Sequence, residues 1–245
     1  MEAFYFSSPP LFGVYHAARS FDSATLVVIC PPMMDEYRRS YRAFSDFAQA
    51  CSQTGHHVMR FDYRGTGDSH SDLQDVKDVR VWVEDLDLAI EEGLALSGAE
   101  KVILVGARFG ANIALLSAHP AVSKRICWDS LASGRAYLDW LANVDNFVLE
   151  EHREAAKYTN TAFKLDDCVQ FAISESLKAS IEALDETAFR SPDLLLTTLS
   201  KPAERLPGCA PVKVEFDYNW PEYEDGVISP APVFTYILDK LNDWV

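Results

Sequence analysis

The stretch that most constrains the fold is "KVILVGARFGANIALL", residues 101–116. An apolar run of β-type residues ends at Gly106, and a helix rich in small residues leaves from Gly110. A strand that turns into a helix within so few residues is the building unit of a parallel sheet covered by helices. The stretch therefore predicts an α/β fold in which Arg108 stands on a tight turn at the end of a strand.

The chain on both sides of this stretch continues the alternation. Two β-type runs separated by "SPP" predict an antiparallel hairpin over residues 1–17. Residues 24–30, "ATLVVIC", form the continuous β-branched run that is typical of a strand buried on both faces. Further strands are predicted over residues 57–62, 101–106, 124–129, 193–200 and 212–218. The order of strands and helices predicts a mainly parallel sheet with helices on both faces.

Helices are predicted between these strands. The first ends at Gly55, the second begins at the cap residue Asp78, the third runs from Phe109 to about His119, and "PVFTYILDKLNDWV" closes the chain. Residues 134–190 have a helical pattern and no strand. They predict a helical cap inserted between two parts of one α/β core.

We therefore expect the core to comprise residues 1–133 and 191–245, with the cap at residues 134–190. A chain of 245 residues with 48% apolar content can bury one large core.

Charge and cysteine content narrow the class of protein. The formal net charge of −15 argues against a general nucleic-acid binder or a binder of anionic membranes. The five cysteines are far apart and form no C-x-x-C pair, as in a reducing compartment. We expect a cytoplasmic protein, with no signal peptide and no membrane span. No cluster has the spacing of metal ligands, and no cofactor is expected.

Three stretches carry a resemblance to a known family. They are "RFDYRGTGDS" (60–69), "LVGARFGANIALL" (104–116) and "CWDSLASGRAYLDWL" (127–141). Together they resemble the α/β-hydrolase superfamily, in its serine aminopeptidase and lipase-like branch. This resemblance implies a mostly parallel eight-stranded sheet with helices on both faces and a helical cap. In addition, "CPPMMDEYRRSYR" with an arginine at the turn resembles a bacterial subgroup of exosortase-system-associated hydrolases, found beside exopolysaccharide and protein-sorting genes.

The resemblance also implies a nucleophile elbow, G-x-S-x-G, whose serine is served by a histidine and an acid. Arg108 occupies the serine position, and its guanidinium stays protonated and has no lone pair with which to attack. The histidine should follow the eighth strand, yet the last of the six histidines is His152. Glu204 is the nearest acid after the seventh strand, and Asp129 is an alternative acid at the end of the sixth. The Ser–His–Asp mechanism is therefore not expected.

The resemblance implies two backbone donors for an oxyanion hole. The N–H of Phe109 supplies one, and the loop "ICPPMM" supplies the other. Pro32 has no N–H to donate, so Met33 would have to replace it. Loss of one such donor lowers the rate by about 10²–10³.

Three interpretations of function remain open. The first is a pseudo-hydrolase that binds a small anionic or acyl ligand, possible contacts being Arg108, Phe109, Pro32, Met33 and Asp129. Alternatively, Arg108 pairs internally with Asp129 or Asp217 and locks the pocket. We favour this pairing because an unpaired buried arginine is costly. The charged stretch "DEYRR" (35–39) is either a pocket rim or, as we favour, a solvated helix start.

The second interpretation is an active hydrolase, esterase or transferase with a relocated nucleophile on the loops at the same end of the sheet. Cys127 and Ser69 are the main candidates, with Ser130 and Cys30 beside them. The third is an accessory interaction protein of an exopolysaccharide or sorting system, whose cap presents an apolar face to a partner. The cap aromatics concerned are Trp140, Phe147, Phe163 and Phe171, although we favour their packing on the sheet.

Overall fold

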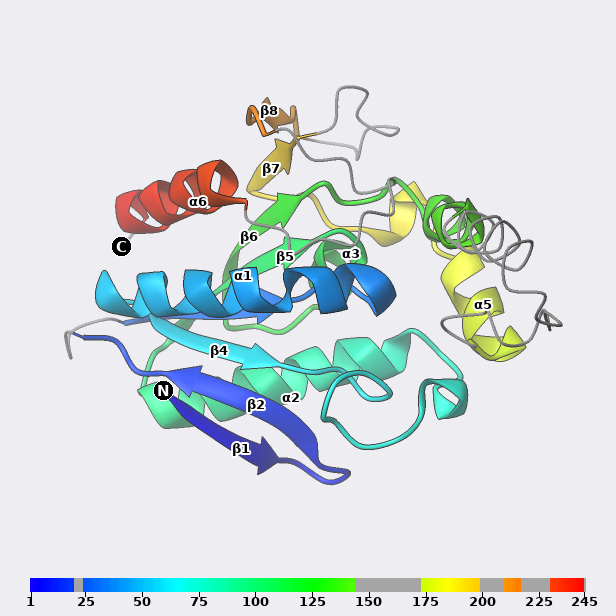
Figure 1. Cartoon of the computed structure of the whole chain (residues 1–245), viewed down its shortest axis with the longest axis horizontal. Helices are drawn as coiled ribbons and strands as arrows, with labels where there is room; N and C mark the ends of the chain where they lie inside the picture. Colours follow the sequence, from blue (N-terminus) through cyan, green and yellow to red (C-terminus); the bar gives the residue numbers. More distant parts are fainter. Residues whose placement is uncertain (20–23, 144–172, 199–208, 217–229, 245) are drawn as a thin grey trace, which may run out of the picture.

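The computed structural model describes residues 1–19, 24–143, 173–198, 209–216 and 230–244 (Figure 1). Its eight strands form one sheet in the order β1-β2-β4-β3-β5-β6-β7-β8. The strands are β1 (Glu2–Phe6), β2 (Leu11–His16), β3 (Thr25–Cys30), β4 (His57–Phe61), β5 (Lys101–Ala107), β6 (Val122–Trp128), β7 (Leu194–Thr197) and β8 (Val212–Lys213). The pairs β1–β2 and β2–β4 are antiparallel and all the others are parallel, which confirms the predicted mostly parallel sheet.

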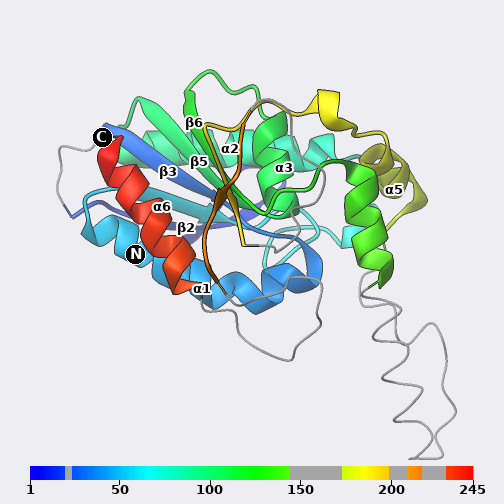
Figure 2. The same ribbon diagram turned by 90° about the horizontal axis from the view of Figure 1, so that it is seen from above.

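Helices cover both faces of this sheet, as predicted. They are α1 (Met34–Gln53), α2 (Arg80–Ser97), α3 (Phe109–Leu116), α5 (Glu175–Glu182) and α6 (Ala231–Asp243), with short 3-10 helices η1 (Leu73–Asp75) and η3 (Glu186–Ala188). Residues 134–143 are also helical. Figures 1 and 2 show α1 and α6 together on one face, and α2 and α3 on the other.

The central strand β3 explains why two apolar layers form. Its six residues are all buried. Leu26 and Val28 pack in the cluster that contains the buried faces of α2 and α3. Val27 and Ile29 pack in the cluster that contains those of α1 and α6. Because side chains alternate along a strand, the continuous β-branched run serves both layers, which confirms the prediction of a strand buried on both faces.

Several predicted elements are shorter in the structure, and strand β7 spans Leu194–Thr197 of the predicted 193–200. Helix α3 ends at Leu116 rather than near His119, because Ser117 takes an extended conformation and Pro120 disfavours a helical residue before it. Strand β8 spans two residues of the predicted 212–218, and residues from 217 to 229 lie outside the described part of the chain.

The described part of the predicted cap lies beside the core (Figure 1). Gly134, at the start of helix 134–143, donates its N–H to the carbonyl of Leu184 at 2.8 Å. A Cβ at Gly134 would lie only 1.7 Å from the carbonyl oxygen of Ile181, so these two segments are in direct contact. Residues 144–172 lie outside the described residues, and the domain boundaries at 134 and 190 stay predictions.

A buried histidine in β2 gives the fold a testable pH dependence. His16 is 3% exposed, and burial together with the charge of Arg60 lowers its pKa from 6.5 to about 4. The folded protein therefore binds fewer protons than the unfolded chain between these two values. The difference in proton binding makes a contribution to the free energy of unfolding that depends on pH. This contribution is fully present above pH 6.5 and is lost as the pH falls through about 4.

We expect His16→Gln to remove this part of the acid sensitivity. Urea denaturation between neutral pH and pH 4 should show the wild type losing roughly 3 kcal/mol more than the variant. The exposed His70, replaced in the same way, is the matched control and should leave the slope unchanged. Equal slopes for the wild type and His16→Gln would contradict the assignment.

Candidate functional site

The turn between β5 and α3 holds Arg108 in an unusual backbone conformation. Its φ is 53° and its ψ is −132°, a combination that residues other than glycine rarely adopt. The N–H of Arg108 donates to the carbonyl of Trp128 at 2.9 Å, and its own carbonyl accepts the N–H of Ala111 at 3.0 Å. Strand β6 and helix α3 thus hold the strained turn in place.

The two flanking glycines are required by close backbone contacts. A Cβ at Gly106 would lie 2.5 Å from the Cα of Ala111. A Cβ at Gly110 would lie 2.0 Å from the carbonyl oxygen of Pro31, in the loop after β3. Both distances are far below a normal contact, so a side chain at either position would displace backbone. The loop after β3 therefore packs directly against the turn.

The side chain of Arg108 forms a buried ion pair with Glu36 of α1. Its Nε donates to Oε1 of Glu36 at 2.6 Å, and its terminal nitrogen donates to the backbone carbonyl of Asp129 at 3.2 Å. The guanidinium also lies 5.5 Å from the centre of the Trp140 ring. Arg108 is 4% exposed and Glu36 is fully buried.

Glu36 is an acid that we did not predict as a partner of Arg108. Asp129 offers Arg108 its backbone oxygen, while its carboxylate accepts the N–H of Thr198 at 3.0 Å and the hydroxyl of Thr198 at 2.5 Å. The carboxylate of Asp129 is thus hydrogen-bonded to Thr198, the residue that follows β7. The other predicted partner, Asp217, lies outside the described residues, as does Glu204.

The charged stretch 35–39 is a buried rim and not the solvated helix start that we favoured. Asp35, Glu36 and Arg39 are all buried in the first two turns of α1. Asp35 bridges Arg39 at 3.2 Å and Arg38 at 2.9 Å. Burial raises the pKa of the Glu36 carboxyl, and the charges of Arg108 and Arg39 oppose that rise.

The two segments expected to form an oxyanion hole do meet at this turn. Pro32 and Met33 are buried between β3 and α1. Phe109 is the first residue of α3, and its ring stacks on Tyr137 with centroids 4.2 Å apart. The role of Pro32, Met33 and Phe109 in binding a ligand stays a prediction.

Comparison with known proteins agrees with this geometry. Residues 23–137 match the family described as serine aminopeptidase, S33. Mouse alpha/beta hydrolase domain-containing protein 10 superposes over 100% of this chain and 98% of its own, with 14% identity and a TM-score of 0.57. The fold is the α/β-hydrolase fold. Arg108 lies on the turn between β5 and α3, where the sequence predicts the nucleophile elbow, and this turn is named the elbow below.

Other solved structures match part of the chain. A serine hydrolase without a lid from Xanthomonas campestris is 20% identical, over 54% of this chain and 62% of its own, with a TM-score of 0.46. An esterase from Pyrococcus furiosus is 17% identical, over 61% of this chain and 55% of its own, with a TM-score of 0.47. No curated protein matches the sequence.

The candidate relocated nucleophiles are unsuited to attack. Cys127 lies within β6 and not on a loop as we expected, is fully buried, and burial raises the pKa of its thiol. Burial raises the pKa of Cys30 to about 12. The hydroxyl of Ser69 donates to the carbonyl of Asp62 at 2.5 Å and accepts the N–H of Phe12 at 2.8 Å, as a turn residue does. Ser130 is half-buried.

The described histidines lie away from Arg108, and His16 is buried in β2. His57 is hydrogen-bonded to Tyr15 at 2.5 Å at the start of β4, and His56 to Asn242 at 2.9 Å. His119 lies 3.5 Å from Glu91. Within the described ranges, no histidine hydrogen-bonds to Arg108, Glu36 or Asp129; His152 lies outside them.

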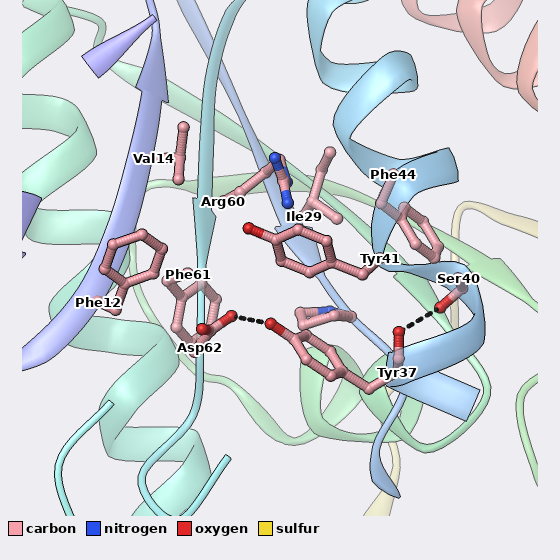
Figure 3. Close-up of a pocket in the computed structure, with 11 residues that line it drawn as sticks. Phe12, Val14, Ile29, Tyr37, Ser40, Tyr41, Phe44, Arg60, Phe61 and Asp62 are labelled. Carbon is pink, nitrogen blue, oxygen red and sulfur yellow. Dashed lines mark hydrogen bonds between the residues drawn. The ribbon is translucent and has the colours of Figure 1, made fainter. Parts of the chain in front are cut away.

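A narrow cleft that we did not predict lies on the α1 face of β4 (Figure 3). The Tyr37 hydroxyl donates to Asp62 at 2.5 Å, and Arg60 lies over the ring of Tyr41 at 4.8 Å. The enclosed volume is about 10 Å³, enough for roughly one water molecule. Pro31 also lines this cleft, so it adjoins the loop that contacts the elbow. Neither Arg108 nor Glu36 lines it.

The described residues contain neither a metal-binding cluster nor a membrane-spanning helix. In that part of the chain, no three His, Cys, Asp or Glu side chains lie close enough together to hold a metal ion. None of the described helices has the length and hydropathy needed to span a membrane.

The Arg108–Glu36 pair can be tested by a double-mutant cycle. Arg108→Met should cost about 3–5 kcal/mol in the free energy of unfolding, because it leaves the Glu36 carboxylate buried and unpaired. Adding Glu36→Leu should recover most of that loss, since well-packed apolar residues can replace a buried ion pair. Urea denaturation measures both changes.

The control is Arg108→Met combined with Asp129→Leu. Because the Asp129 carboxylate serves Thr198, this second substitution should add its own cost and rescue nothing. Rescue by Asp129→Leu rather than by Glu36→Leu would show that the pair is assigned to the wrong acid.

Proposed function

We propose that this α/β-hydrolase-fold protein is a pseudo-hydrolase: it lacks the Ser–His–Asp mechanism and binds a small ligand at the elbow, under the cap. The observation that carries this proposal is the buried pairing of Arg108 with Glu36. The elbow of an active enzyme presents a nucleophile to a substrate. Here that position holds a guanidinium, which has no lone pair and is tied to a carboxylate.

The surroundings of the elbow support the same proposal. General-base catalysis needs an imidazole within hydrogen-bond reach of the nucleophile. The described histidines lie elsewhere, and the carboxylate of Asp129 accepts two hydrogen bonds from Thr198. The buried thiols of Cys127 and Cys30 stay protonated, which weighs against a relocated cysteine.

Of the two ligand classes that the sequence suggests, the pairing favours an acyl group over an anion. Glu36 already compensates the charge of Arg108, so a carboxylate ligand would add an uncompensated negative charge to a buried site. An acyl carbonyl carries no charge and needs only hydrogen-bond donors. Its contacts would come from Arg108, Phe109, Pro32, Met33 and Asp129.

We also propose that the chain is a bacterial, cytoplasmic protein of the exosortase-associated subgroup. The stretch that carries this resemblance, "CPPMMDEYRRSYR", contains Glu36, so the subgroup motif and the elbow arginine meet in one ion pair. The four described cysteines are free thiols, as expected in a reducing compartment. An accessory role in such a system is a second candidate, although Trp140 is buried against the core and unavailable to a partner.

A probe-and-turnover experiment tests the absence of hydrolase chemistry. Pure wild-type protein should not hydrolyse short-chain acyl esters and should show no adduct by intact mass after fluorophosphonate treatment. Arg108→Ser combined with Glu36→Gln should stay inactive, because a serine without an imidazole base is not activated. Cys127→Ala should behave as the wild type does.

A stoichiometric adduct in the wild type would overturn the pseudo-hydrolase proposal. If Cys127→Ala or Ser130→Ala then abolished it, the nucleophile would be located. Circular dichroism of each variant checks that inactivity does not come from unfolding.

A further inference from the structure

Three buried polar atoms around Arg108 have no hydrogen-bond partner in the described part of the chain. They are Oε2 of Glu36, the hydroxyl of Tyr137 and Nε1 of Trp140. All three residues are more than nine-tenths buried. Buried polar side-chain atoms without a partner are uncommon in folded proteins, and each needs a physical explanation. Because all three lie near Arg108, we expect a bound group that forms hydrogen bonds with them.

The two aromatic residues face the elbow from one helix. Tyr137 and Trp140 are three residues apart in helix 134–143, so they share a face of it. Their rings stack with centroids 6.0 Å apart. Tyr137 also stacks on Phe109, and the Trp140 ring lies 5.5 Å from the Arg108 guanidinium. The unpaired atoms thus come from two elements, helix 134–143 and α1. The side chain of Arg108 contacts both elements, through Glu36 and Trp140.

The charges at this place favour a neutral occupant. The carboxylate of Glu36 balances the guanidinium of Arg108. Burial raises the pKa of the Tyr137 hydroxyl far above its ordinary value, so this group stays a neutral donor. An anion would face the unpaired oxygen of Glu36, and a cation would face Arg108. Binding of either an anion or a cation would therefore be electrostatically unfavourable.

The unpaired atoms specify hydrogen bonds of both kinds. Trp140 Nε1 can only donate, the Tyr137 hydroxyl can donate, and the ionised Glu36 oxygen can only accept. A carboxamide has the matching groups: an NH₂ that donates and a carbonyl oxygen with two lone pairs. A carboxylate lacks the donor, and so does an ester.

We propose that the elbow site recognises a carboxamide on a short apolar chain, whose NH₂ donates to Glu36 Oε2 and whose carbonyl accepts from Tyr137 and Trp140. This inference rests on the proposed function, since it names the ligand class of the same site. The rings of Phe109, Tyr137 and Trp140 supply apolar surface for the chain.

The test compares three ligands of equal chain length on the full-length protein: butyramide, butyrate and methyl butyrate. Ligand-observed NMR titration should show butyramide binding at least about 10-fold more tightly than either analogue, because each analogue leaves Glu36 Oε2 without a donor. Tyr137→Phe should weaken butyramide binding by about 3- to 10-fold, the loss of one neutral hydrogen bond.

The matched control is Tyr63→Phe, which removes another fully buried tyrosine hydroxyl and should leave butyramide binding unchanged. Butyrate binding as tightly as butyramide would overturn the carboxamide class and leave the pseudo-hydrolase proposal intact. Binding of none of the three at millimolar concentrations, as expected if only water fills the site, would also overturn it. So would equal effects of Tyr137→Phe and Tyr63→Phe.

Ammonia release separates the two proposals. The same samples are assayed for ammonia after incubation with butyramide. Butyramide bound and intact supports both proposals. Butyramide bound and hydrolysed would overturn the pseudo-hydrolase proposal while supporting the carboxamide class.

Discussion

The buried ion pair between Arg108 and Glu36 is the interaction on which the carboxyl end of the sheet depends. It joins the turn after β5 to the first turn of α1, and the two residues are 72 positions apart in the chain. Two buried charges are stable only if they meet in good geometry, because each loses its hydration. The pair therefore fixes how α1 approaches the elbow, and Asp35, Arg38 and Arg39 continue the charged network along the same helix.

Backbone contacts also determine how α1 and Glu36 lie relative to the elbow. The positive φ of Arg108 and the close approach of Gly110 to the carbonyl of Pro31 require the loop after β3 to lie against the turn. That loop leads directly into α1, whose third residue is Glu36. The position of the carboxylate is thus a consequence of backbone packing. Side-chain pairing then stabilises what the glycines permit.

The sequence was sufficient for the fold and for the elbow, but not for the partner of Arg108. Local signals carry the first two: the β-branched run of β3, and the two glycines that flank Arg108 at positions where a Cβ would collide with backbone. The end of α3 was predicted too late because Ser117 and Pro120 outweigh its apolar pattern. The buried rim at residues 35–39 was missed because "DEYRR" has the composition of an exposed helix start, and only its place beneath the elbow buries it.

The helix dipole explains why a carboxylate has to accompany this arginine. In an α/β hydrolase the N-terminus of the helix after the elbow stabilises negative charge on the substrate. Arg108 is the residue before α3, so its positive charge lies at the end of the helix that already carries partial positive charge. A guanidinium alone would be destabilised there by both burial and the dipole. Glu36 opposes both effects, because its carboxylate lies 2.6 Å from the Nε of Arg108. An elbow that carries its own anion gains little electrostatic stabilisation from a second one, and this supports the proposal of a neutral ligand.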